Sequence, residues 1–463
     1  MIEIKEQQVA SILDEVIQGL QKEEDSRLVS ITKRIEETDP LSFFRAAKQF
    51  GEDRTFWTSS SQKLWLVGAG RAHQISSDYS RFEETEKQWD QVLEKAFVHN
   101  PYEIPGTGLV ALGGLSFDPK KKPTKLWNKF KPSHFTIPKF LLTKYDNRYY
   151  FTINVSVNKN DHAKQLADEL HIMEKQLMVS YVEMTDELTI TNELEIDPEE
   201  WKSSVQKAME EITHGSVKKI VLAREVRLKF DREVNISTVL TNLLKTQPNS
   251  YIFAYEIDED CFVGATPERL VKLEGNKLLS TCLAGTAPRG NTKIEDLKFA
   301  DRLLNDEKNR EEHHFVVKMI KQAINDYCTD ITIPDKPVVY PLRNLQHLYT
   351  PVTANIKKSY SIFDIIKQLH PTPALGGTPR EESLAFIRKH EQLDRGWYGA
   401  PIGWMDSNHN GEFAVAIRSS LIQRDVASLF AGCGVVKDSD PESEYEETKI
   451  KFMPMLSVLG GKK

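Results

Sequence analysis

The amino-acid sequence predicts an α+β fold with antiparallel β-sheets, arranged as one large two-sheet body and not as two independent domains. Between about Phe56 and Ser156, short apolar runs alternate with turn signals, a pattern typical of antiparallel strands. In the second half, strands are not separated by regular single helices, which disfavours a doubly wound sheet. No repeat of fixed period is visible. The chain has 463 residues, of which 40% are hydrophobic, enough for a large core.

The overall charge and the cysteine pattern exclude several classes of protein. With 61 basic and 68 acidic residues, the net charge is −7, which gives no general attraction to nucleic acid or anionic membranes. The four cysteines form no C-x-x-C pair, so neither a zinc site nor a disulfide framework is indicated. The charged N-terminus is unlike a signal peptide, and no run of about 18 apolar residues exists to span a membrane. We therefore expect a soluble, cytoplasmic protein with no nucleic-acid or membrane partner.

Residues 1–190 are expected to form a variable N-terminal half of this fold. In the first 50 residues, apolar side chains recur at helical spacing between Ile12 and Leu20, which predicts mostly helix. Asp146-Asn147 lies between two apolar runs and predicts a hairpin turn. The predicted elements are a mostly helical stretch (1–50), antiparallel strands (56–156), a polar helix (161–179) and a connector (180–196).

Residues 191–455 mix helices and strands again. The predicted elements are a helix (199–213), two strands (219–230 and 251–262), the longest helix (306–327) and a further strand (412–423). A short helix near the C-terminus has a well-marked start. Asp440 is a natural N-cap, Pro441 suits the first helical position, and Glu442 favours the positive end of the helix dipole.

Two segments imitate functional motifs. Gly68-Ala69-Gly70 follows a strand, but His73 occupies the place of the third glycine of a dinucleotide fingerprint, so a turn is the better interpretation. Residues 119–132 hold six lysines with two aromatic residues between them, as an RNA or membrane patch would. Flanking prolines and the acidic chain favour a solvated loop instead.

Three carboxylates are candidate metal ligands. Glu444 and Glu447 lie three apart and so share one face of the C-terminal helix. Glu312 lies four residues before Val316, in line with the apolar stripe of the longest helix, and a buried carboxylate there needs a partner. The alternative is that Glu312 points to solvent near the start of its helix. Carboxylates without His or Cys favour Mg²⁺ over zinc.

Three further charged residues are candidates for chemistry. Lys219 shares a strand face with Val221 and Ala223, where partial desolvation favours the neutral amine that a lysine base needs, unless it reaches solvent at the strand entry. Arg418 is predicted to share a face of small residues with Ala414 and Ala416, with room for a carboxylate, whether of a ligand or of the protein. Glu268 follows a Gly-Ala-Thr-Pro turn whose proline stiffens the chain around the acid; the alternative is a plain surface turn.

These segments, in this order, resemble the chorismate-utilising enzymes. The resemblance spans about Leu194 to Phe452, and ten ordered motifs carry it: KIVLAR, GATPERL, LAGTAPRG, the Glu-His of REEHHF, LQHL, LHPTPALGG, YGAPIGW, GEFAVAIRS, LFAGCGVV and ESEYEETKIK. A weaker similarity is present at GLVALGGLSFDP. The resemblance implies a single α+β domain with two large antiparallel sheets packed face to face and helices outside. It also makes residues 191–455 the chorismate-binding catalytic region.

Within that family the chain is most similar to members that convert chorismate to isochorismate, and by length to those serving menaquinone biosynthesis. Aminating relatives usually have glutamine at the place of Lys219, and aminodeoxychorismate-forming relatives have a lysine at the place of Ala284. No tryptophan-binding motif of the anthranilate type is evident. The resemblance therefore implies no amination and no glutaminase subunit, with chorismate as the small-molecule substrate and a monomer or weak dimer as the assembly.

The resemblance also assigns roles. Lys219 would activate water, Glu268 would protonate the leaving hydroxyl, and Glu312, Glu444 and Glu447 would hold Mg²⁺. The expected substrate-binding residues are Arg418 and Lys451 for carboxylates, the backbone at Gly432 and Gly434, and the lining residues Tyr398, His347, Thr286, Ala284 and Gly285.

Several alternatives stay open from the sequence. A relative that goes on to eliminate pyruvate and form salicylate shares the same lysine, acid and metal residues. Siderophore pathways also use isochorismate. A non-catalytic chorismate-binding subunit is a third alternative, against which the intact lysine, acid and three carboxylates argue, since a pure binder needs no acid–base pair.

Overall fold

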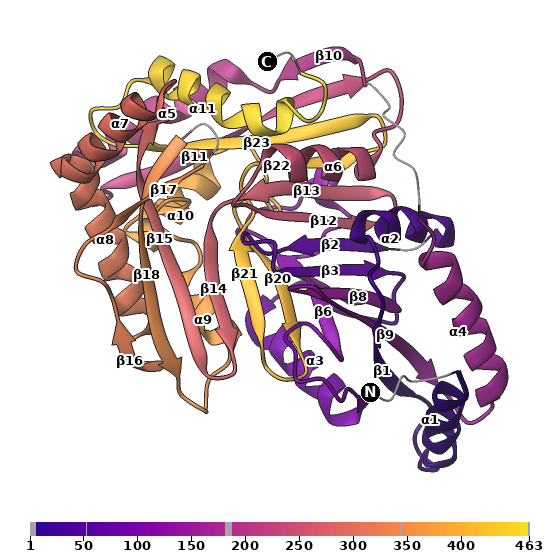
Figure 1. Ribbon diagram of the computed structural model, residues 1–463. Coiled ribbons are helices and arrows are strands. Elements are labelled where there is room, and N and C mark those ends of the chain that lie inside the picture. Colours follow the sequence, from indigo (N-terminus) through magenta and orange to yellow (C-terminus); the bar gives the residue numbers. More distant parts are fainter. Residues whose placement is uncertain (1–5, 52, 181–187, 343–344, 462–463) are drawn as a thin grey trace.

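Two large β-sheets, both almost entirely antiparallel, form the centre of the molecule in the computed structural model (Figure 1). The structure describes residues 6–51, 53–180, 188–342 and 345–461. Among the strand pairs of these residues only β1 and β5 run parallel. Strands from before and after residue 190 occur in both sheets, so the chain forms one body. The predicted α+β class with two packed sheets is confirmed.

The larger sheet, in spatial order, contains β10 (Ile190–Glu195), β11 (Lys219–Phe230), β23 (Val426–Val435), β22 (Ser419–Gln423), β13 (Asp260–Thr266), β12 (Tyr251–Ile257), β2 (Arg54–Thr58), β3 (Leu64–Ala69), β8 (Phe140–Tyr145), β9 (Arg148–Val157), β1 (Arg27–Ile35) and β5 (Phe97–His99), and β19 (Gly377–Thr378) pairs with β11. The smaller sheet contains β16 (Cys328–Thr332), β18 (Leu345–Ile356), β15 (Lys277–Pro288), β14 (Arg269–Glu274), β21 (Gly411–Val415), β20 (Pro401–Asp406), β6 (Val110–Leu115), β7 (Ser133–Ile137) and β4 (His73–Ser77), and β17 (Val338–Pro341) pairs with β18.

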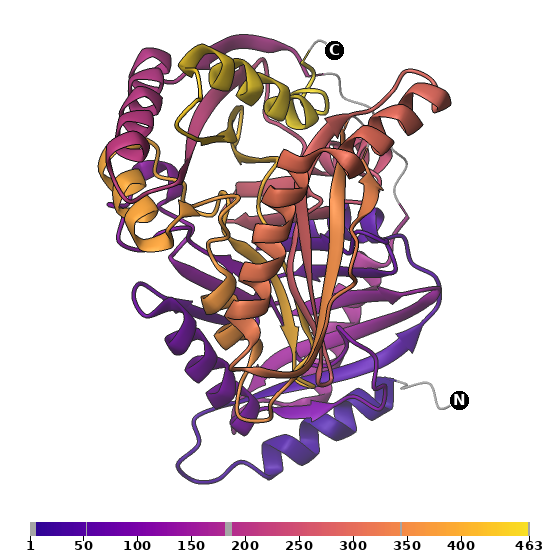
Figure 2. The ribbon, with the colours of Figure 1, turned by 90° about the vertical axis from the view of Figure 1, so that its left-hand side faces the viewer.

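Helices cover the outer faces of both sheets (Figures 1 and 2). They are α1 (Glu6–Gln18), α2 (Pro40–Ala46), η1 (Ala47–Phe50), α3 (Arg81–Lys95), η2 (Lys125–Trp127), α4 (Ala163–Leu177), α5 (Pro198–His214), α6 (Ile236–Thr246), α7 (Lys293–Asn305), α8 (Glu307–Ile324), α9 (Ile362–Leu369), α10 (Arg380–His390) and α11 (Pro441–Leu456). No helix of the described residues is long and apolar enough to cross a membrane.

The core has a layered arrangement. Aromatic side chains fill the space between the sheets, among them Trp57, Phe262, Trp397 and Trp404, none of which has any exposed surface. A second cluster lies under α1, α2, α4 and α6 on the outer face of the larger sheet, and a third lies under α3, α8 and α9 against the smaller sheet. A burial of this extent on both faces of each sheet supplies most of the driving force for folding.

Several predicted elements are confirmed. Strand β11 and helices α4, α5 and α8 lie where the sequence indicates them, and Asp146 forms the predicted hairpin turn with a φ of 51°. Gly70 also lies in a turn, with a φ of 68°, and Gly68 packs so closely on Thr55 that a side chain there has no space. This segment is therefore a tight strand-to-turn connection.

Other predictions are wrong, and each error has a physical cause. The mostly helical stretch 1–50 contains strand β1, in which the buried apolar residues Val29 and Ile31 alternate with the polar residues Ser30 and Thr32. This two-residue period was overlooked because the preceding segment has helical spacing. The strand region 56–156 contains helix α3, whose buried side is formed by Arg81, Thr85 and Trp89. Because two of these three are polar, the apolar stripe formed by Trp89 with Phe82, Val92 and Leu93 is interrupted and its helical spacing is weak.

Three further boundaries differ. Residues 181–187 of the predicted connector lie outside the described residues, and strand β10 follows them and pairs with β11. The predicted strand 251–262 is a hairpin of β12 and β13, whose two turn residues have positive φ. The lysine-rich loop 119–132 is solvated only in part, because Trp127 and Phe130 are buried in the aromatic layer between the sheets.

Candidate active site

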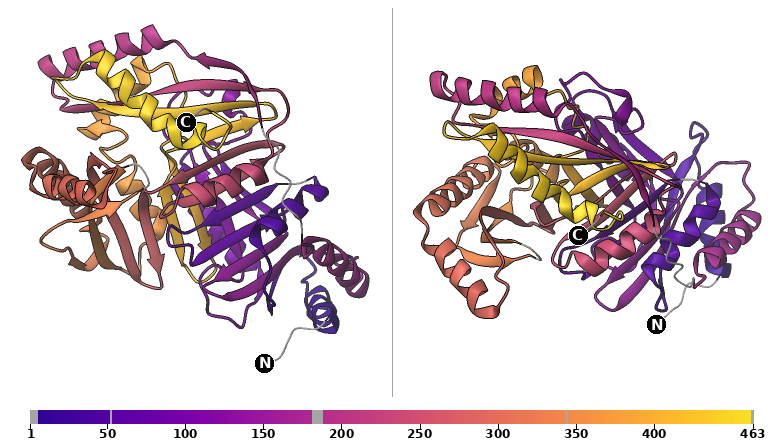
Figure 3. Two further views of the ribbon diagram at one scale, coloured as in Figure 1. Left: turned by 45° about the horizontal axis from the view of Figure 1, so that its top comes forward. Right: turned by 90° about the horizontal axis from the view of Figure 1, so that it is seen from above.

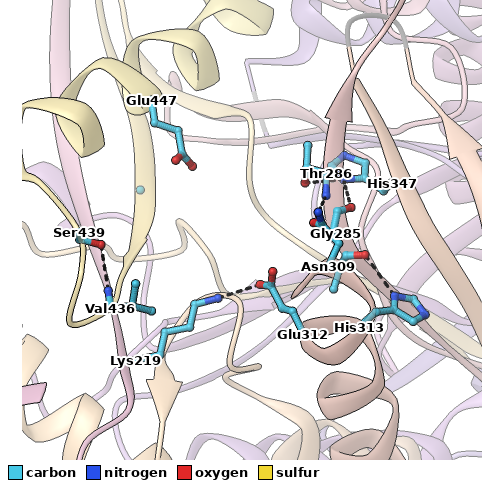
Figure 4. A network of polar contacts seen from close by, with 12 residues as sticks. Lys219, Gly285, Thr286, Asn309, Glu312, His313, His347, Val436, Ser439 and Glu447 are labelled. Carbon is cyan, nitrogen blue, oxygen red and sulfur yellow. Dashed lines mark hydrogen bonds and ion pairs between the residues drawn. The ribbon is translucent and has the colours of Figure 1, made fainter. Parts of the chain in front are cut away.

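Lys219 is the first residue of β11, and its side chain reaches across to Glu312 on α8 (Figure 4). The Lys219 Nζ to Glu312 Oε1 distance is 3.1 Å, and the lysine side chain is 26% exposed. On the other face of β11, Ile220 and Leu222 pack against α5 and α10. Lys219 is therefore partly buried, as expected, but it also forms an ion pair that the sequence did not indicate.

A glycine on the neighbouring strand makes room for this lysine. Gly434 lies opposite Val221 in the β11–β23 register, and the Lys219 side chain passes over it. A Cβ at position 434 would lie 2.5 Å from Lys219 Cε, well inside van der Waals contact. The predicted role of Gly434 in binding anions through its backbone stays a prediction, whereas its lack of a side chain has a visible reason.

Glu312 was predicted to lie on the buried stripe of α8, and this prediction is wrong. Its side chain is 47% exposed, and the buried stripe instead begins at the next residue, His313. His313 joins α8 to two strands: its Nδ1–H donates to Ala284 O at 3.1 Å, and its Nε2 accepts from Thr350 Oγ1 at 2.7 Å. Burial lowers the pKa of His313, in keeping with this neutral form. His313 thus fixes the turn of α8 that presents Glu312.

The strand beside α8 carries the predicted lining residues at a bulge. The β15–β18 register shifts between Ala284 and Thr286, and Gly285 between them has a φ of 75°. His347 on β18 contacts Thr286 Oγ1 at 3.0 Å and Gly285 O at 3.3 Å through Nδ1. Burial lowers the pKa of His347 to about 4, so the ring is neutral. Its Nε2 is buried and finds no hydrogen-bond partner among the residues that the structure describes.

Glu268 lies where the chain passes from the larger sheet to the smaller one, between β13 and β14. Its backbone carbonyl accepts from Val415 N at 2.9 Å. Burial raises the pKa of the Glu268 carboxyl to about 7, and the charge of Arg418 opposes this rise only in part. The pKa of the Cys282 thiol is raised mainly by burial and further by the charges of Glu268 and Glu312. Both carboxylates therefore act on the same thiol.

Arg418 lies where the chain passes back from the smaller sheet to the larger one. The predicted continuous strand 412–423 is wrong, because it is interrupted at this point. The chain leaves the smaller sheet after β21 and enters the larger sheet at β22, with Arg418 between them at a φ of 51°. Arg418 therefore does not share an alternating strand face with Ala414 and Ala416. Its carbonyl accepts from Ala265 N at 3.1 Å, and burial lowers the pKa of its guanidinium to about 10, which leaves it charged at neutral pH.

Helix α11 lies across the site from α8. Its predicted start is confirmed, because the Asp440 side chain accepts from Ser443 N and Pro441 is the first helical residue. Lys451 pairs with Glu447 at 2.7 Å, as two residues one turn apart on one face do, and donates to Gly432 O at 2.8 Å. Glu444 is held differently, because it accepts from Ser439 Oγ at 2.7 Å.

The three predicted metal ligands are not brought together. Glu312 and Glu447 face the same opening from α8 and α11 (Figure 4), two helices on different sides of the molecule (Figure 3). Over the described ranges, no three His, Cys, Asp or Glu side chains converge on one point where a metal ion fits. The chemistry of the side chains suits Mg²⁺, because α8 and α11 each supply a carboxylate, and Mg²⁺ prefers oxygen ligands. Each of these carboxylates, Glu312 and Glu447, is paired with a lysine. The Mg²⁺ site stays a prediction.

Tyr398 is 4% exposed and stacks on Phe430, with a ring distance of 5.4 Å, and burial raises the pKa of its hydroxyl. It lies three residues after Arg395, whose carbonyl accepts from Tyr398 N. Sequence reasoning missed His313 and Ser439 as supporting residues. His313 follows the predicted ligand Glu312 and Ser439 lies five residues before the predicted ligand Glu444, and only their partners in space distinguish them from surface residues.

Comparison with known proteins gives a consistent result. A family model described as chorismate binding enzyme matches residues 13–460. The chain is 41% identical over 459 residues to isochorismate synthase MenF of Bacillus subtilis, covering 97% of this chain and 98% of that protein. It is 32% identical over 440 residues to the salicylate biosynthesis isochorismate synthase of Pseudomonas aeruginosa, with 94% and 91% coverage.

Two solved structures share the fold. The menaquinone-specific isochorismate synthase MenF of Escherichia coli matches with a TM-score of 0.79 at 24% identity, covering 98% of this chain and 100% of that one. Anthranilate synthase component I of Streptococcus pneumoniae matches with a TM-score of 0.69 at 19% identity, covering 85% and 92%.

The raised pKa of Glu268 predicts a pH-dependent stability. Between the ordinary value of 4.5 and about 7, the unfolded chain loses this proton and the folded one keeps it. The stabilising effect is thus fully present below pH 4.5 and is lost as the pH rises to about 7, on the order of 3 kcal/mol in all. Chemical denaturation from pH 4 to 8 should show Glu268→Gln gaining stability relative to wild type over this window. A constant difference would contradict the assignment.

Proposed function

Because the chain belongs to the family of chorismate binding enzymes, we propose that it is an isochorismate synthase, an isomerase that converts chorismate to isochorismate. The full-length similarity to the B. subtilis enzyme supports this activity. The structural observation that supports the proposal is a buried acid, Glu268, with a pKa of about 7, together with Lys219, which pairs with Glu312. The charges of both Glu268 and Glu312 act on the thiol of Cys282, which links the acid to the surroundings of the lysine. A cytoplasmic role in menaquinone biosynthesis without a glutaminase subunit is part of the proposal.

The proposed reaction needs one proton removed and one supplied. Chorismate is a dicarboxylate with a ring hydroxyl and an enolpyruvyl ether. Water adds at the second ring carbon, the double bonds shift, and the hydroxyl at the fourth carbon leaves. In this mechanism Lys219 takes the proton from the attacking water, and protonated Glu268 gives one to the departing hydroxyl. The opposed roles fit a carboxyl whose pKa burial has moved to neutrality.

The charged residues around the opening suit a dianionic substrate. Arg418 stays positively charged and would bind the enolpyruvyl carboxylate in a bidentate fork. Lys451 lies on the opposite wall beside Glu447. Glu312 and Glu447, with Glu444 beside them, would hold Mg²⁺, which when bound offsets the negative charge of the ring carboxylate. Tyr398, His347, Thr286 and the Ala284–Gly285 bulge would line the remaining surface.

The salicylate-forming alternative has less support. The relatives that serve salicylate and vibriobactin synthesis in P. aeruginosa and Vibrio cholerae are themselves named isochorismate synthases. A second product, pyruvate, would distinguish the two reactions. The siderophore pathways and the menaquinone pathway start from the same product, so the pathway is a separate question from the reaction.

The first test is product identity. Incubating the protein with chorismate and Mg²⁺, followed by chromatography, should give isochorismate without pyruvate. Lys219→Ala should lower kcat by about a hundredfold or more, because the base is lost, while chorismate binding stays measurable by calorimetry. Near wild-type turnover by this variant would show that Lys219 is not the base, and pyruvate release would favour the salicylate-forming activity.

A matched pair of carboxylates tests the metal ligand. Glu447→Gln should weaken Mg²⁺ binding measured by titration calorimetry and raise the Mg²⁺ concentration needed for half-maximal turnover. Glu446→Gln is the control, since Glu446 is 57% exposed and pairs with Lys449 on the outer side of the same helix. Equal effects of the two substitutions would remove Glu447 from the metal site.

The contact between Gly434 and Lys219 predicts a further variant. Gly434→Ala should displace the flexible end of Lys219 without much change in melting temperature, and should lower kcat by about tenfold to a hundredfold. In the Lys219→Ala background the same substitution should have no further effect on turnover, because the displaced side chain is already absent. Additive losses would show that Gly434 acts through something other than Lys219.

A further inference from the structure

Strand β11, which carries Lys219, has a gap along one edge. Strand β23 pairs with its other edge from Ile220 to Lys229. On the gapped edge, β19 covers only the first two residues, and β10 begins to pair at Val226. Within the described chain, no strand pairs with residues 221–225 on that edge. A cavity of about 320 Å³ lies there, lined in part by Ala223 and Glu391.

Two side chains take the place of the missing strand. Ala223 N donates to Glu391 Oε2 at 2.7 Å, and Arg395 Nη2 donates to Val221 O at 2.7 Å. The arginine and the glutamate form a two-point ion pair of 2.7 and 2.6 Å and are 3% and 4% exposed. Together they offer the strand one acceptor and one donor, as a neighbouring strand does.

The same pair also fixes the segment that covers Lys219 itself. Arg395 Nη1 donates to Leu375 O at 2.9 Å, in the loop that leads to β19. Beyond that loop, Thr378 of β19 is the register partner of Lys219, and the Lys219 carbonyl accepts from Ser383 Oγ at 3.0 Å. The pair therefore holds both β11 and the approach to β19, on the two sides of the proposed base.

We propose that Glu391 and Arg395 are positioning residues for Lys219, a role that rests on the proposed function. They bind the backbone of β11 two and four residues beyond the lysine and so determine where its Nζ lies. A buried ion pair adds little net stability compared with apolar side chains, so stability alone does not account for a pair in this place. The geometry of a base, in contrast, affects rate at the scale of an ångström.

The test replaces the fork of Arg395 with a single charge. Arg395→Lys keeps a cation beside Glu391 but cannot reach Val221 O and Leu375 O together. We expect kcat to fall by about tenfold to a hundredfold and KM for chorismate to change by less than about twofold. Hydrogen exchange at the amides of residues 219–225 should become faster, while that of residues 226–229 stays unchanged.

Arg388→Lys is the matched control. Arg388 lies on α10, pairs with Asp118 at 2.8 Å, and its side chain forms no hydrogen bond to β11 within the described part of the chain. The kcat of Arg388→Lys should equal that of wild type. Glu391→Gln is a second probe if Arg395→Lys does not fold, because its amide oxygen still accepts from Ala223 N.

The outcomes separate the two proposals. If wild type makes no isochorismate, the proposed function fails, and the exchange rates still decide whether the pair fixes β11. If wild type is active and Arg395→Lys loses melting temperature but keeps kcat and slow exchange at residues 219–225, the positioning role is overturned. Failure of both variants to fold would also overturn it, since the pair would then serve folding.

Discussion

The arrangement of the site depends on two backbone hydrogen bonds at two of the places where the chain passes between the sheets, after β13 and after β21. At one crossing, Glu268 O accepts from Val415 N, and at the other, Arg418 O accepts from Ala265 N. Each bond ties a residue leaving one sheet to a strand of the other. The acid and the arginine are therefore held at a corner that neither sheet has alone, and the aromatic layer between the sheets fixes the depth of that corner. Such a site is available only once both sheets have formed and packed.

Charge at this corner is balanced locally in a chain whose net charge is −7. Lys219 faces Glu312, Lys451 faces Glu447, and Arg418 lies near Glu268. The two lysines that an anionic ligand needs are thus already paired, and a dianion entering the site competes with protein carboxylates for them. In the proposed function a hard cation resolves this competition, because it takes up the carboxylates that the lysines release.

Local sequence patterns predicted the strands and helices that carry the site, but they did not predict the contacts between these elements that form it. Strand β11 and helix α8 follow from hydrophobic spacing, and the start of α11 follows from Asp440 and Pro441. The break at Arg418 was missed, because EFAVAIRSSL alternates cleanly through the very point where the chain changes sheets. No local pattern encodes the partner of a backbone group at a crossing, since that partner is about 150 residues away.

The separation of the metal-ligand candidates has a similar cause. Sequence spacing places Glu444 and Glu447 on one helix face, but it contains no information on the distance between two helices. Likewise, the apolar stripe of α8 packs as predicted, but its extension back to Glu312 is wrong. The buried residue at that turn is His313, which is held by hydrogen bonds to Ala284 and Thr350 and not by hydrophobicity. Polar residues that pack through specific partners are hidden from any analysis of apolar periodicity.

The contact between Lys219 and Gly434 also bears on how such a site can change over generations. Any residue larger than glycine at position 434 occupies the volume of the lysine stem, so the substitution is compatible only with a shorter or redirected side chain at position 219. In the reverse order, a smaller residue first replaces Lys219. The volume of the lysine side chain is then empty, and a larger residue fits at position 434. The two positions therefore constrain the order of mutations: residue 219 must change before position 434 is filled, and a lineage that filled position 434 would regain a lysine base only after restoring the glycine.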